Sequence, residues 1–572
     1  MKGFLMLKAY FYIIGLSLAL AADTRSSGYT ISTDSIFKHI SILASDSMEG
    51  REVGEPGELK AAQYIASIFM ASGLTPKGDN NSWFQYFEFT KGTEYGQGNT
   101  LLINGKLLRL HEEYVPLLQS SSGVFVLNEV MDLGYGINSG DGQYNDYDGK
   151  SVEGKPVLIR RYAPSADSFP HVDFDKFSSL TDKIATAIDN KVSAIFFVTP
   201  LNQDDTIPSM AATRIAVKEI PIIWLKRAGL KKLGLDLQKP KITRVSGNTD
   251  LVRVKDTGMN VIGFIQGKSD STVIVGGHYD HLGWGNAASR YTGTEHLIHY
   301  GADDNASGTA GVLELSRYFI QQPEPSNYSL LFIAFSGEET GILGSNHFAK
   351  NMTVAPDKIR MMLNMDMIGR LKVEDSGLGI FGTGTAEAFK TYFATYSRSD
   401  MKMTFKETGT GPSDHTAFYN ASIPVLFFFT GQHEDYHKPS DIASKINLEG
   451  TRRVLGVVTE IISHFDSTQT TLAFQKTKDE TGQMARSFSV TLGIMPDYIA
   501  EVVGLRVDGV SANRPAERAG ILRGDVIIKL GDYKIDDINA YMSALGKFRK
   551  GQSTQALVIR ENDTLNLKVE FK

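Results

Sequence analysis

The sequence predicts an α/β protein in which a mostly parallel or mixed sheet is sandwiched by helices, with a β-rich insert and a separate C-terminal module. After residue 260, short and continuously apolar runs alternate with helical patterns, which is typical of a sheet covered on both faces. Clusters of histidine and acidic residues stand where these runs end, as expected for a site at the carboxyl ends of strands. Between residues 96 and 248 the apolar runs are shorter and the connections are polar and glycine-rich.

Composition limits the partners and the compartment. The 572 residues carry 59 basic and 65 acidic side chains, and a net charge of −6 argues against nucleic acid or an anionic membrane as a partner. There is no cysteine, so no disulfide framework can form. A charged start, an apolar run over residues 9–20 and small residues after it predict a signal peptide over 1–21, too short for a stable membrane span. We therefore expect an exported protein, either periplasmic or extracellular.

The first segment of the main domain, residues 28–95, precedes the insert. Apolar residues at three- and four-residue spacing predict helices over 35–43 and 58–70, and residues 83–89 alternate as in a strand. Between the helices lies a glycine-rich, charged turn, Ser45–Glu58. In the insert, 96–248, we expect strands at 155–160, 194–198 and 220–225, with a short helix over 182–190.

The second segment of the main domain, residues 249–466, carries the α/β rhythm. Strands are expected at 272–275, 329–335, 359–363 and 424–429, and helices at 305–321 and 448–465. A polar stretch without periodicity, 467–483, predicts a linker. Residues 484–572 then form a self-contained module.

Three acidic or histidine clusters fall between Gly276 and Gly341, and two more follow at later strand ends. They supply five candidate metal ligands, His278, Asp303, Glu339, Asp366 and His437. Two imidazoles and three carboxylates suit zinc, and the lack of thiolates argues against a purely structural site. Because five ligands are too many for one four-coordinate ion with an open position, we expect two Zn²⁺ ions that share one carboxylate. Any one cluster alone could be a solvated loop or a helix cap, but their joint occurrence at strand ends favours a site.

Other side chains in the clusters predict catalytic and supporting roles. Glu338, next to the ligand Glu339, is a free carboxylate placed to accept a proton from water and to deliver it to a leaving amine. Asp280 is spaced to orient the His278 imidazole, and Asp441 could do the same for His437. His415 is the best of the remaining histidines for a substrate contact.

The ordered series HYDHLG, GADDNASG, SGEETGILGS, NMDMIG and YHKPSD resembles the co-catalytic di-zinc aminopeptidase family, which also includes glutamate carboxypeptidase II and the transferrin receptor. The resemblance covers 35–465 apart from the insert, and makes the main domain (28–95 and 249–466) a zinc-exopeptidase fold. It implies that His278 and Asp366 bind one zinc and Glu339 and His437 the other, with Asp303 bridging. It also implies that Glu338 is the general base and that Asp304 helps to hold the α-amino group of the substrate.

The two accessory regions also resemble known domains. The insert is similar to a protease-associated (PA) domain, and the C-terminal module is similar to a PDZ domain. In the PDZ-like module the loop Leu492, Gly493, Ile494 and Met495 would bind a carboxylate. Such a domain implies a partner that is an extended chain end or C-terminus, bound by strand addition.

The hypothesis from the sequence is an exported di-zinc aminopeptidase that acts on peptides with a free N-terminus. A carboxypeptidase or dipeptidase on the same scaffold, or a glutaminyl cyclase, is the enzymatic alternative. A non-catalytic PA–PDZ peptide-binding protein with a vestigial zinc site is the alternative from another class.

Overall fold

The computed structural model describes residues 29–139, 142–165, 168–169, 171–172, 174, 177–206, 218–372, 377–477, 490–497, 500, 502–510, 514–549, 551–561 and 563–571. The expected signal peptide and the end of the expected linker, residues 478–483, lie outside these residues. No helix among those the structure describes is long and apolar enough to cross a membrane. The chain divides into two compact units, one of residues 1–88 with 257–572 and one of residues 89–256.

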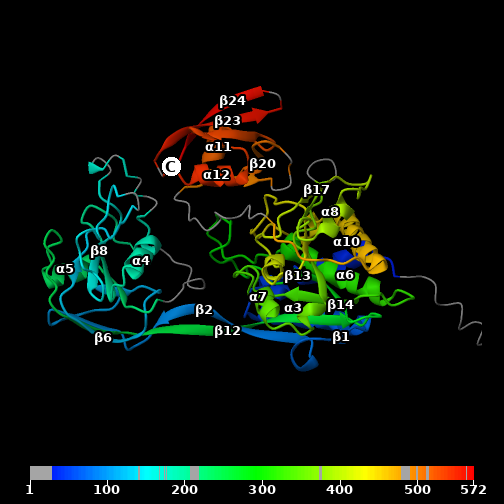
Figure 1. Cartoon of the computed structure of the whole chain (residues 1–572), viewed down its shortest axis with the longest axis horizontal. Coiled ribbons are helices and arrows are strands. Elements are labelled where there is room, and N and C mark those ends of the chain that lie inside the picture. The colour runs from blue at the N-terminus through cyan, green and yellow to red at the C-terminus, as the bar shows by residue number, and fades with distance from the viewer. Residues whose placement is uncertain are drawn as a thin grey trace, which may run out of the picture. The chain divides into compact units, whose positions relative to one another are not determined.

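The first unit contains a nine-stranded mixed sheet flanked by helices (Figure 1). Four neighbouring strands at its centre run parallel, in the order β14 (Ser329–Phe335), β13 (Thr272–His278), β15 (Ile359–Met365) and β18 (Val425–Phe429). The sheet is completed by β1 (Thr75–Pro76), β2 (Phe84–Tyr95), β12 (Leu251–Ile265), β16 (Leu378–Phe381) and β17 (Met403–Lys406). Every residue of β13, β14 and β18 is buried, which explains why these strands are continuously apolar in the sequence.

Alternate residues of the central strands contribute to two cores, one on each face of the sheet. On one face Val273 and Val275 belong to the core formed with α2 (Thr33–Leu43), α3 (Pro56–Ser72), α6 (Gly308–Ile320) and α10 (Leu448–Thr468). On the other face Ile274 packs in a second core with α7 (Leu343–Lys350) and α9 (His415–Asn420). The short helix α8 (Glu387–Phe393) contributes Phe389 and Phe393 to the first core.

The site lies where the four parallel strands end. Because β13, β14, β15 and β18 are parallel neighbours, their carboxyl ends meet at one edge of the sheet. The strand β13 ends on His278 itself, and β15 ends one residue before Asp366. The loops after β14 and β18 carry the glutamate pair and His437.

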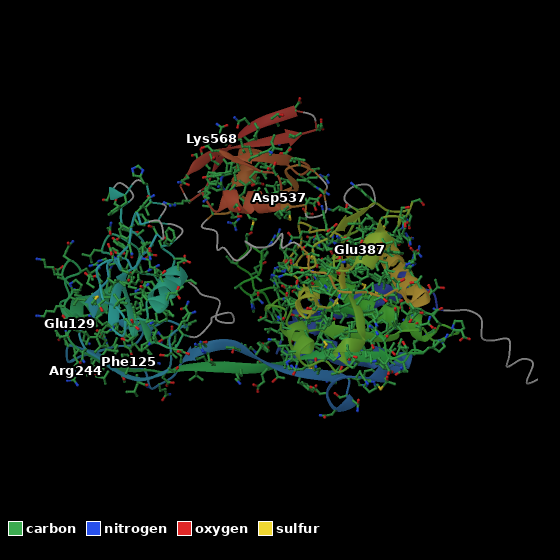
Figure 2. The ribbon with its side chains drawn as sticks, viewed as in Figure 1. Phe125, Glu129, Arg244, Glu387, Asp537 and Lys568 are labelled. Atoms are coloured by element: carbon green, nitrogen blue, oxygen red, sulfur yellow. The ribbon has the colours of Figure 1, made fainter. Side chains whose placement is uncertain are left out.

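Among its described residues, the second unit holds two sheets and two helices. A five-stranded sheet has the order β5 (Tyr114–Pro116), β10 (Ile222–Leu225), β9 (Ala194–Val198), β8 (Pro156–Arg160) and β7 (Met131–Asp132). The four-stranded sheet has the order β4 (Lys106–Leu108), β3 (Thr100–Ile103), β11 (Val245–Thr249) and β6 (Gly123–Leu127). Phe125 of β6 and Arg244, next to β11, are labelled in Figure 2. Helices α4 (Leu180–Asp189) and α5 (Arg227–Leu233) complete the unit.

Where the structure describes it, the C-terminal module is an antiparallel sheet with two helices and its own core. Its strands are β19 (Ile494–Pro496), β20 (Leu505–Val510), β21 (Val526–Leu530), β22 (Tyr533–Lys534), β23 (Ser553–Arg560) and β24 (Asp563–Glu570). Its helices are α11 (Pro515–Ala519) and α12 (Ile538–Leu545). Asp537, labelled in Figure 2, begins α12 by accepting a hydrogen bond from the Ala540 amide at 2.7 Å.

Candidate active site

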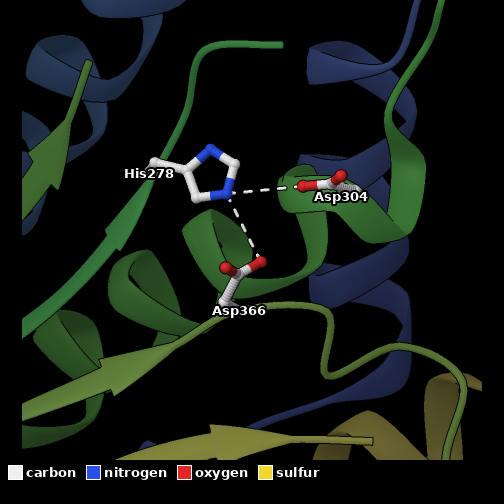
Figure 3. Close-up of side chains that lie close together, drawn as sticks. All are labelled: His278, Asp304 and Asp366. Carbon is white, nitrogen blue, oxygen red and sulfur yellow. Dashed lines mark hydrogen bonds and ion pairs between the residues drawn. The ribbon is translucent and has the colours of Figure 1, made fainter. Parts of the chain in front are cut away.

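The first group of candidate ligands brings together three strand-end or loop residues, His278, Asp304 and Asp366 (Figure 3). The Nε2 atom of His278 lies 3.4 Å from Oδ1 of Asp304 and 3.3 Å from Oδ1 of Asp366. All three side chains are buried, and each can offer one ligand atom to a shared ion. This grouping fits the nitrogen and carboxylate donors that zinc prefers.

The second group lies around the other oxygen of Asp304. The Nε2 atom of His437 is 3.2 Å from Asp304 Oδ2 and 3.1 Å from Glu339 Oε2. The other ring nitrogen of His437, Nδ1, lies 2.9 Å from the carbonyl oxygen of Ala288. A proton on Nδ1 shared with that carbonyl leaves the Nε2 lone pair directed at the two carboxylates, as metal-binding histidines require.

The structure differs from the sequence prediction on which of two adjacent aspartates lies between the groups. Asp303 was expected to bridge, but its Oδ1 accepts a hydrogen bond from the Gly369 amide at 2.6 Å, and its Oδ2 lies 3.1 Å from His433 Nε2. Asp304, expected to bind the substrate amine, instead faces both His278 and His437. Successive side chains leave the backbone in different directions, so only one of the pair can face the cluster.

Asp441 supports the cluster in a way that also differs from the prediction. It was expected to orient His437, but the His437 ring is held by Ala288. The Oδ2 atom of Asp441 accepts hydrogen bonds from the backbone amides of Asp303 at 2.8 Å and Asp304 at 3.1 Å. Asp441 therefore fixes the backbone from which the central carboxylate extends.

Asp280 lies beside His278, where the sequence placed it, and also contacts the glutamate loop. Its Oδ1 atom is 3.6 Å from Nδ1 of His278, and the same oxygen accepts a hydrogen bond from the Glu338 amide at 3.1 Å. The backbone carbonyl of Asp280 is 3.2 Å from the same imidazole nitrogen. Asp280 thus connects the strand end of β13 with the loop that carries Glu338 and Glu339.

Glu338 points toward the first group of ligands. Its Oε2 atom lies 3.9 Å from Nε2 of His278. Burial raises the pKa of Glu338 well above its ordinary value, and the carboxylates of Glu339 and Asp366 add to this although His278 opposes it. A carboxyl group with a raised pKa beside a cluster of candidate ligands is suited to accepting and returning a proton.

The imidazoles and carboxylates of the cluster stabilise one another's charges. Burial alone would lower the pKa of His278, but Asp366 and Glu338 outweigh it and raise the pKa well above its usual range. Burial would likewise raise the pKa of Asp304, but hydrogen bonds with His278 and His437 hold it well below its usual range. A buried region with this excess of carboxylates favours the binding of cations.

Two supporting residues were not assigned these positions from the sequence. His281 is fully buried and its Nδ1 lies 2.8 Å from Glu339 Oε1, which places it in the second group. Ser413 donates a hydrogen bond from Oγ to Oδ2 of Asp366 at 2.8 Å. The spacing in HYDH and PSDH offered a weak signal for both, because each lies within a few residues of a residue that sequence analysis had singled out.

His415 does not reach the substrate side of the pocket. The imidazole is fully buried at the start of α9 and stacks on the Phe427 ring with centroids 4.4 Å apart. Burial lowers the pKa of His415 to about 3, so the ring is neutral. Its observed role is to support an aromatic side chain of the pocket wall.

The pocket beside the candidate ligands has an acidic side and an apolar side. Asp304, Glu338, Glu339 and Asp366 line the first. The apolar lining of the peptidase includes Met367, Phe381, Phe427, Phe429 and Tyr436. Their rings pack on one another, for example Phe381 on Phe427 with centroids 5.5 Å apart. One small molecule could therefore place a charged group and an apolar group in the same pocket.

In the C-terminal module the expected carboxylate-binding loop, Leu492–Met495, runs into β19, which stands at one end of the strand order β19-β20-β21-β23-β24. Leu492 is fully buried in the core of the module and Met495 is buried, whereas Ile494 is half-buried. Gly493 has a φ of 79°, which favours glycine. The arrangement is compatible with strand addition at β19.

Comparison with known proteins identifies the two domains that these features define. Residues 260–470 match the peptidase family M28, and residues 472–571 match the PDZ domain. The chain therefore carries an M28 peptidase domain, of the co-catalytic zinc aminopeptidase family, followed by a C-terminal PDZ domain. These matches confirm the resemblance to zinc aminopeptidases and to PDZ domains, and the fold class, that were predicted from the sequence.

Particular relatives of the chain are aminopeptidases. Aminopeptidase YwaD of Bacillus subtilis is 26% identical over 432 residues, which are 73% of this chain and 82% of the relative. A probable leucine aminopeptidase of Trichophyton verrucosum is 32% identical over 35% of this chain, and the chain spans only about half of that relative, 55%. Among solved structures, an aminopeptidase from Aneurinibacillus sp. strain AM-1 has a TM-score of 0.43 at 21% identity, covering 78% of this chain and 95% of its own.

Proposed function

We propose that the protein is an exported aminopeptidase that binds two zinc ions and releases N-terminal residues from peptides. The observation that carries the proposal is the position of Asp304, whose two oxygens face two different groups of ligands. In this assignment His278 and Asp366 would hold one ion, Glu339 and His437 would hold the other, and Asp304 would contribute to both. This ligand set changes one member of the set expected from the sequence, because Asp304 replaces Asp303.

The residues of the chain fit zinc by number and by chemistry. Each proposed set has one imidazole nitrogen and two carboxylates, His278 with Asp304 and Asp366 in one and His437 with Asp304 and Glu339 in the other. Three ligands leave room for a further ligand in a four-coordinate ion. The donors are buried and already oriented by Asp280, Ala288, Asp441 and Ser413. Bound zinc would supply a Lewis acid and lower the pKa of water toward neutrality.

In the reaction, Glu338 would take the proton from the attacking water and return it to the leaving amine. The raised pKa of its carboxyl group supports both halves of this transfer. The negative cluster beside it would attract the positively charged N-terminus of a peptide. The apolar wall formed by Met367, Phe381, Phe427 and Phe429 would accept the side chain of the first residue, so we expect a preference for large apolar residues.

The first experiment replaces the proposed base. We expect Glu338→Gln to retain both zinc ions but to lose turnover of a leucyl anilide by about 10²- to 10⁴-fold. Zinc is measured by elemental analysis of the dialysed protein, and activity by initial rates. Glu387→Gln, an exposed change at the start of α8, is the matched control and should behave like the unsubstituted protein. Near-normal turnover by Glu338→Gln would exclude the assignment.

A substrate panel separates the alternatives. An aminopeptidase cleaves peptides with a free N-terminus and leaves N-acetylated peptides intact, whether or not the C-terminus is amidated. Cleavage that depends on a free C-terminus would indicate a carboxypeptidase, and cleavage confined to dipeptides a dipeptidase. Cyclisation of N-terminal glutamine without hydrolysis would indicate a glutaminyl cyclase, and zinc-free protein without any turnover would favour a binding protein.

We propose further that the PDZ domain binds an extended C-terminal segment through the loop Leu492–Met495 and the edge of β19. The position of β19 at one end of the strand order supports this proposal. Binding is measured with the Glu338→Gln protein, so that the peptide is not degraded. Loss of affinity on amidation of the peptide C-terminus is the expected result, and equal affinity for acid and amide would contradict carboxylate recognition.

A further inference from the structure

Arg51, in the glycine-rich turn between α2 and α3, is fully buried and makes an unusual set of hydrogen bonds. Its Nε donates to the carbonyl oxygen of Tyr279 at 2.6 Å. Its Nη1 donates to the carbonyls of Leu43 and, at 2.8 Å, Tyr300, and its Nη2 donates to that of Gly301 at 3.0 Å. All four of these acceptors are backbone carbonyl oxygens, so the guanidinium acts as a connector between chain segments.

Two of those segments carry the proposed zinc ligands. Tyr279 directly follows His278, and it lies between that ligand and the supporting residue Asp280. Gly301 lies a few residues before Asp304, the carboxylate shared by both groups. One planar, rigid guanidinium therefore fixes the end of β13 relative to the segment that leads into Asp304.

The backbone around Arg51 strengthens this connection. The His281 amide donates to the carbonyl of Arg51 at 3.2 Å, and the Gly283 amide donates to that of Gly50 at 3.0 Å. Gly50 has a φ of +71°, and a Cβ atom there would lie 2.3 Å from the carbonyl oxygen of Gly283. The turn can approach the ligand loop this closely only with glycine at position 50.

The acidic cluster near Arg51 also favours the positive charge of its guanidinium group. Burial lowers the pKa of Arg51 to about 10, while the carboxylates of Asp280, Asp304, Asp441 and Glu339 oppose that shift. The side chain therefore remains protonated at neutral pH, and its positive charge offsets part of the negative charge of the cluster.

We propose that Arg51 is a positioning residue for the zinc site: it holds the His278 loop and the Asp304 segment at the separation that metal binding requires. The inference rests on the proposed function, because zinc is the ion that the site is assigned. It is not a catalytic role, since Arg51 contacts backbone carbonyls and is not among the residues that line the pocket.

The test measures zinc affinity of the full chain, with Zn²⁺ alone, by competition with a chromophoric chelator. We expect Arg51→Met to weaken zinc binding by about 10- to 100-fold, the range for residues that support metal ligands. Arg51→Lys keeps the charge but not the planar fork, so it should bind zinc with intermediate affinity. At saturating zinc the KM for a peptide should return to that of the unsubstituted protein.

Lys183→Met is the matched control, because Lys183 in the second unit is also fully buried and also donates to the carbonyls of Arg160 and Tyr162. It should lower the melting temperature without changing zinc affinity. If both Arg51 variants bind zinc as the unsubstituted protein does, whatever their melting temperatures, the positioning role is excluded. If the unsubstituted protein itself binds no zinc, the proposed function fails, and the inference fails with it.

Gly50→Ala tests the same connection without touching the charge, and it covers the case in which Arg51→Met does not fold. The added Cβ should push the turn away from Gly283 and weaken zinc binding. Gly73→Ala is its control, since Gly73 has a φ of +91° but open space around it. The control should show the backbone strain as lower stability and leave zinc affinity unchanged, whereas equal zinc affinity in both variants would contradict the proposal.

Discussion

Arg51 and Lys183 show how two regions of one chain treat a buried cation differently. Both are fully buried and both donate to backbone carbonyl oxygens. Burial lowers the pKa of both, to about 10 for Arg51 and about 7 for Lys183. The charged neighbours of the two cations also differ. Four carboxylates oppose the lowering of the Arg51 pKa, whereas at Lys183 Asp146 opposes the lowering and Arg161 adds to it.

The difference teaches that a dense acidic cluster changes the cost of burying a positive charge nearby. In the first unit the guanidinium and the carboxylates stabilise each other, so the cation is part of the electrostatics of the site. In the second unit Lys183 connects the start of α4 to the end of β8. Burial of its positive charge costs free energy, because fewer carboxylates are near enough to offset it. The predictions below change one side of this comparison at a time.

The largest effect is expected from removing the central carboxylate. Asp304→Asn should lose zinc from both positions, and activity should fall by at least the 10²-fold typical of a lost catalytic group, because the same side chain faces His278 and His437. Zinc content after dialysis and turnover of a leucyl anilide measure it. Asp303→Asn is the control and should keep zinc. The reverse result, with zinc lost only from Asp303→Asn, would restore Asp303 as the bridge.

The next largest effect is expected in the pH dependence of the stability of the second unit. The pKa of Lys183 falls from 10.5 to about 7 in the folded protein, so between these values the unfolded chain binds the proton and the folded chain does not. Raising the pH through this window should therefore stabilise the second unit, by about 1.4 kcal/mol per pH unit at most. Lys183→Met should lack this increase. Urea unfolding followed by Trp224 fluorescence, with Trp83 and Trp284 replaced by phenylalanine, measures it at each pH.

A result in which the free energies of unfolding of Lys183→Met and of the parent protein differ by the same amount at every pH from 7 to 10.5 is the contrary outcome. That result would show that the lysine does not lose its proton on folding. In that case the contrast with Arg51 would disappear. Glu338→Gln made in the same background is the reference variant, because it changes the first unit only and should leave the pH profile of Trp224 unfolding as it was.

A smaller effect is expected when an uncharged residue that supports the proposed zinc site is replaced. Ser413→Ala removes the hydrogen bond to Oδ2 of Asp366, which orients the other oxygen toward His278. Zinc affinity should fall, toward the lower end of the 10- to 100-fold range, because the side chain carries no charge. The competition assay used for Arg51 measures it. A loss larger than that of Arg51→Met would mean that the charge and the connection at Arg51 matter less than this single hydrogen bond.

The smallest effect is expected at helix ends in the two units. Ser179 begins α4 and Ser32 begins α2, each by accepting a hydrogen bond from a backbone amide at 3.1 Å. Replacing either with alanine should cost about 1 kcal/mol of stability. Thermal unfolding measures it, and neither change should alter zinc affinity. A change in zinc affinity in Ser179→Ala would show that the second unit influences the site.

The main elements of the fold could be predicted because burial on both faces of the sheet leaves a clear record in the sequence. The strand expected at 329–335 is β14 as observed, and the helix expected at 448–465 lies within α10. Helix ends were less well defined, since α6 begins at Gly308 after a distorted turn that carries Asp303 and Asp304. That turn cannot be deduced from propensities, because its conformation depends on distant partners such as Asp441 and Gly369.

The site could be predicted to the same extent as the fold, because the buried strands are recorded in the sequence but the conformation of the loops is not. The strand ends indicated which loops carry the candidate ligands, and four of the five side chains now proposed as ligands were named from the sequence. The sequence could not distinguish Asp303 from Asp304, since two adjacent aspartates have the same chemistry and only the backbone decides which one faces His278. Nor could it assign Arg51, because a charged residue in a glycine-rich turn reads as solvent-exposed until its carbonyl partners are known.

The turn that holds Arg51 lies before the insert in the chain, whereas every proposed ligand lies after it. During synthesis this turn is made before the whole insert, whereas β13, whose end it contacts, is made after the insert. A fragment limited to the family match, residues 260–470, would contain every proposed ligand but would lack Arg51, the residue proposed to set their spacing. A truncated form of the peptidase should therefore retain the N-terminal segment that contains Arg51.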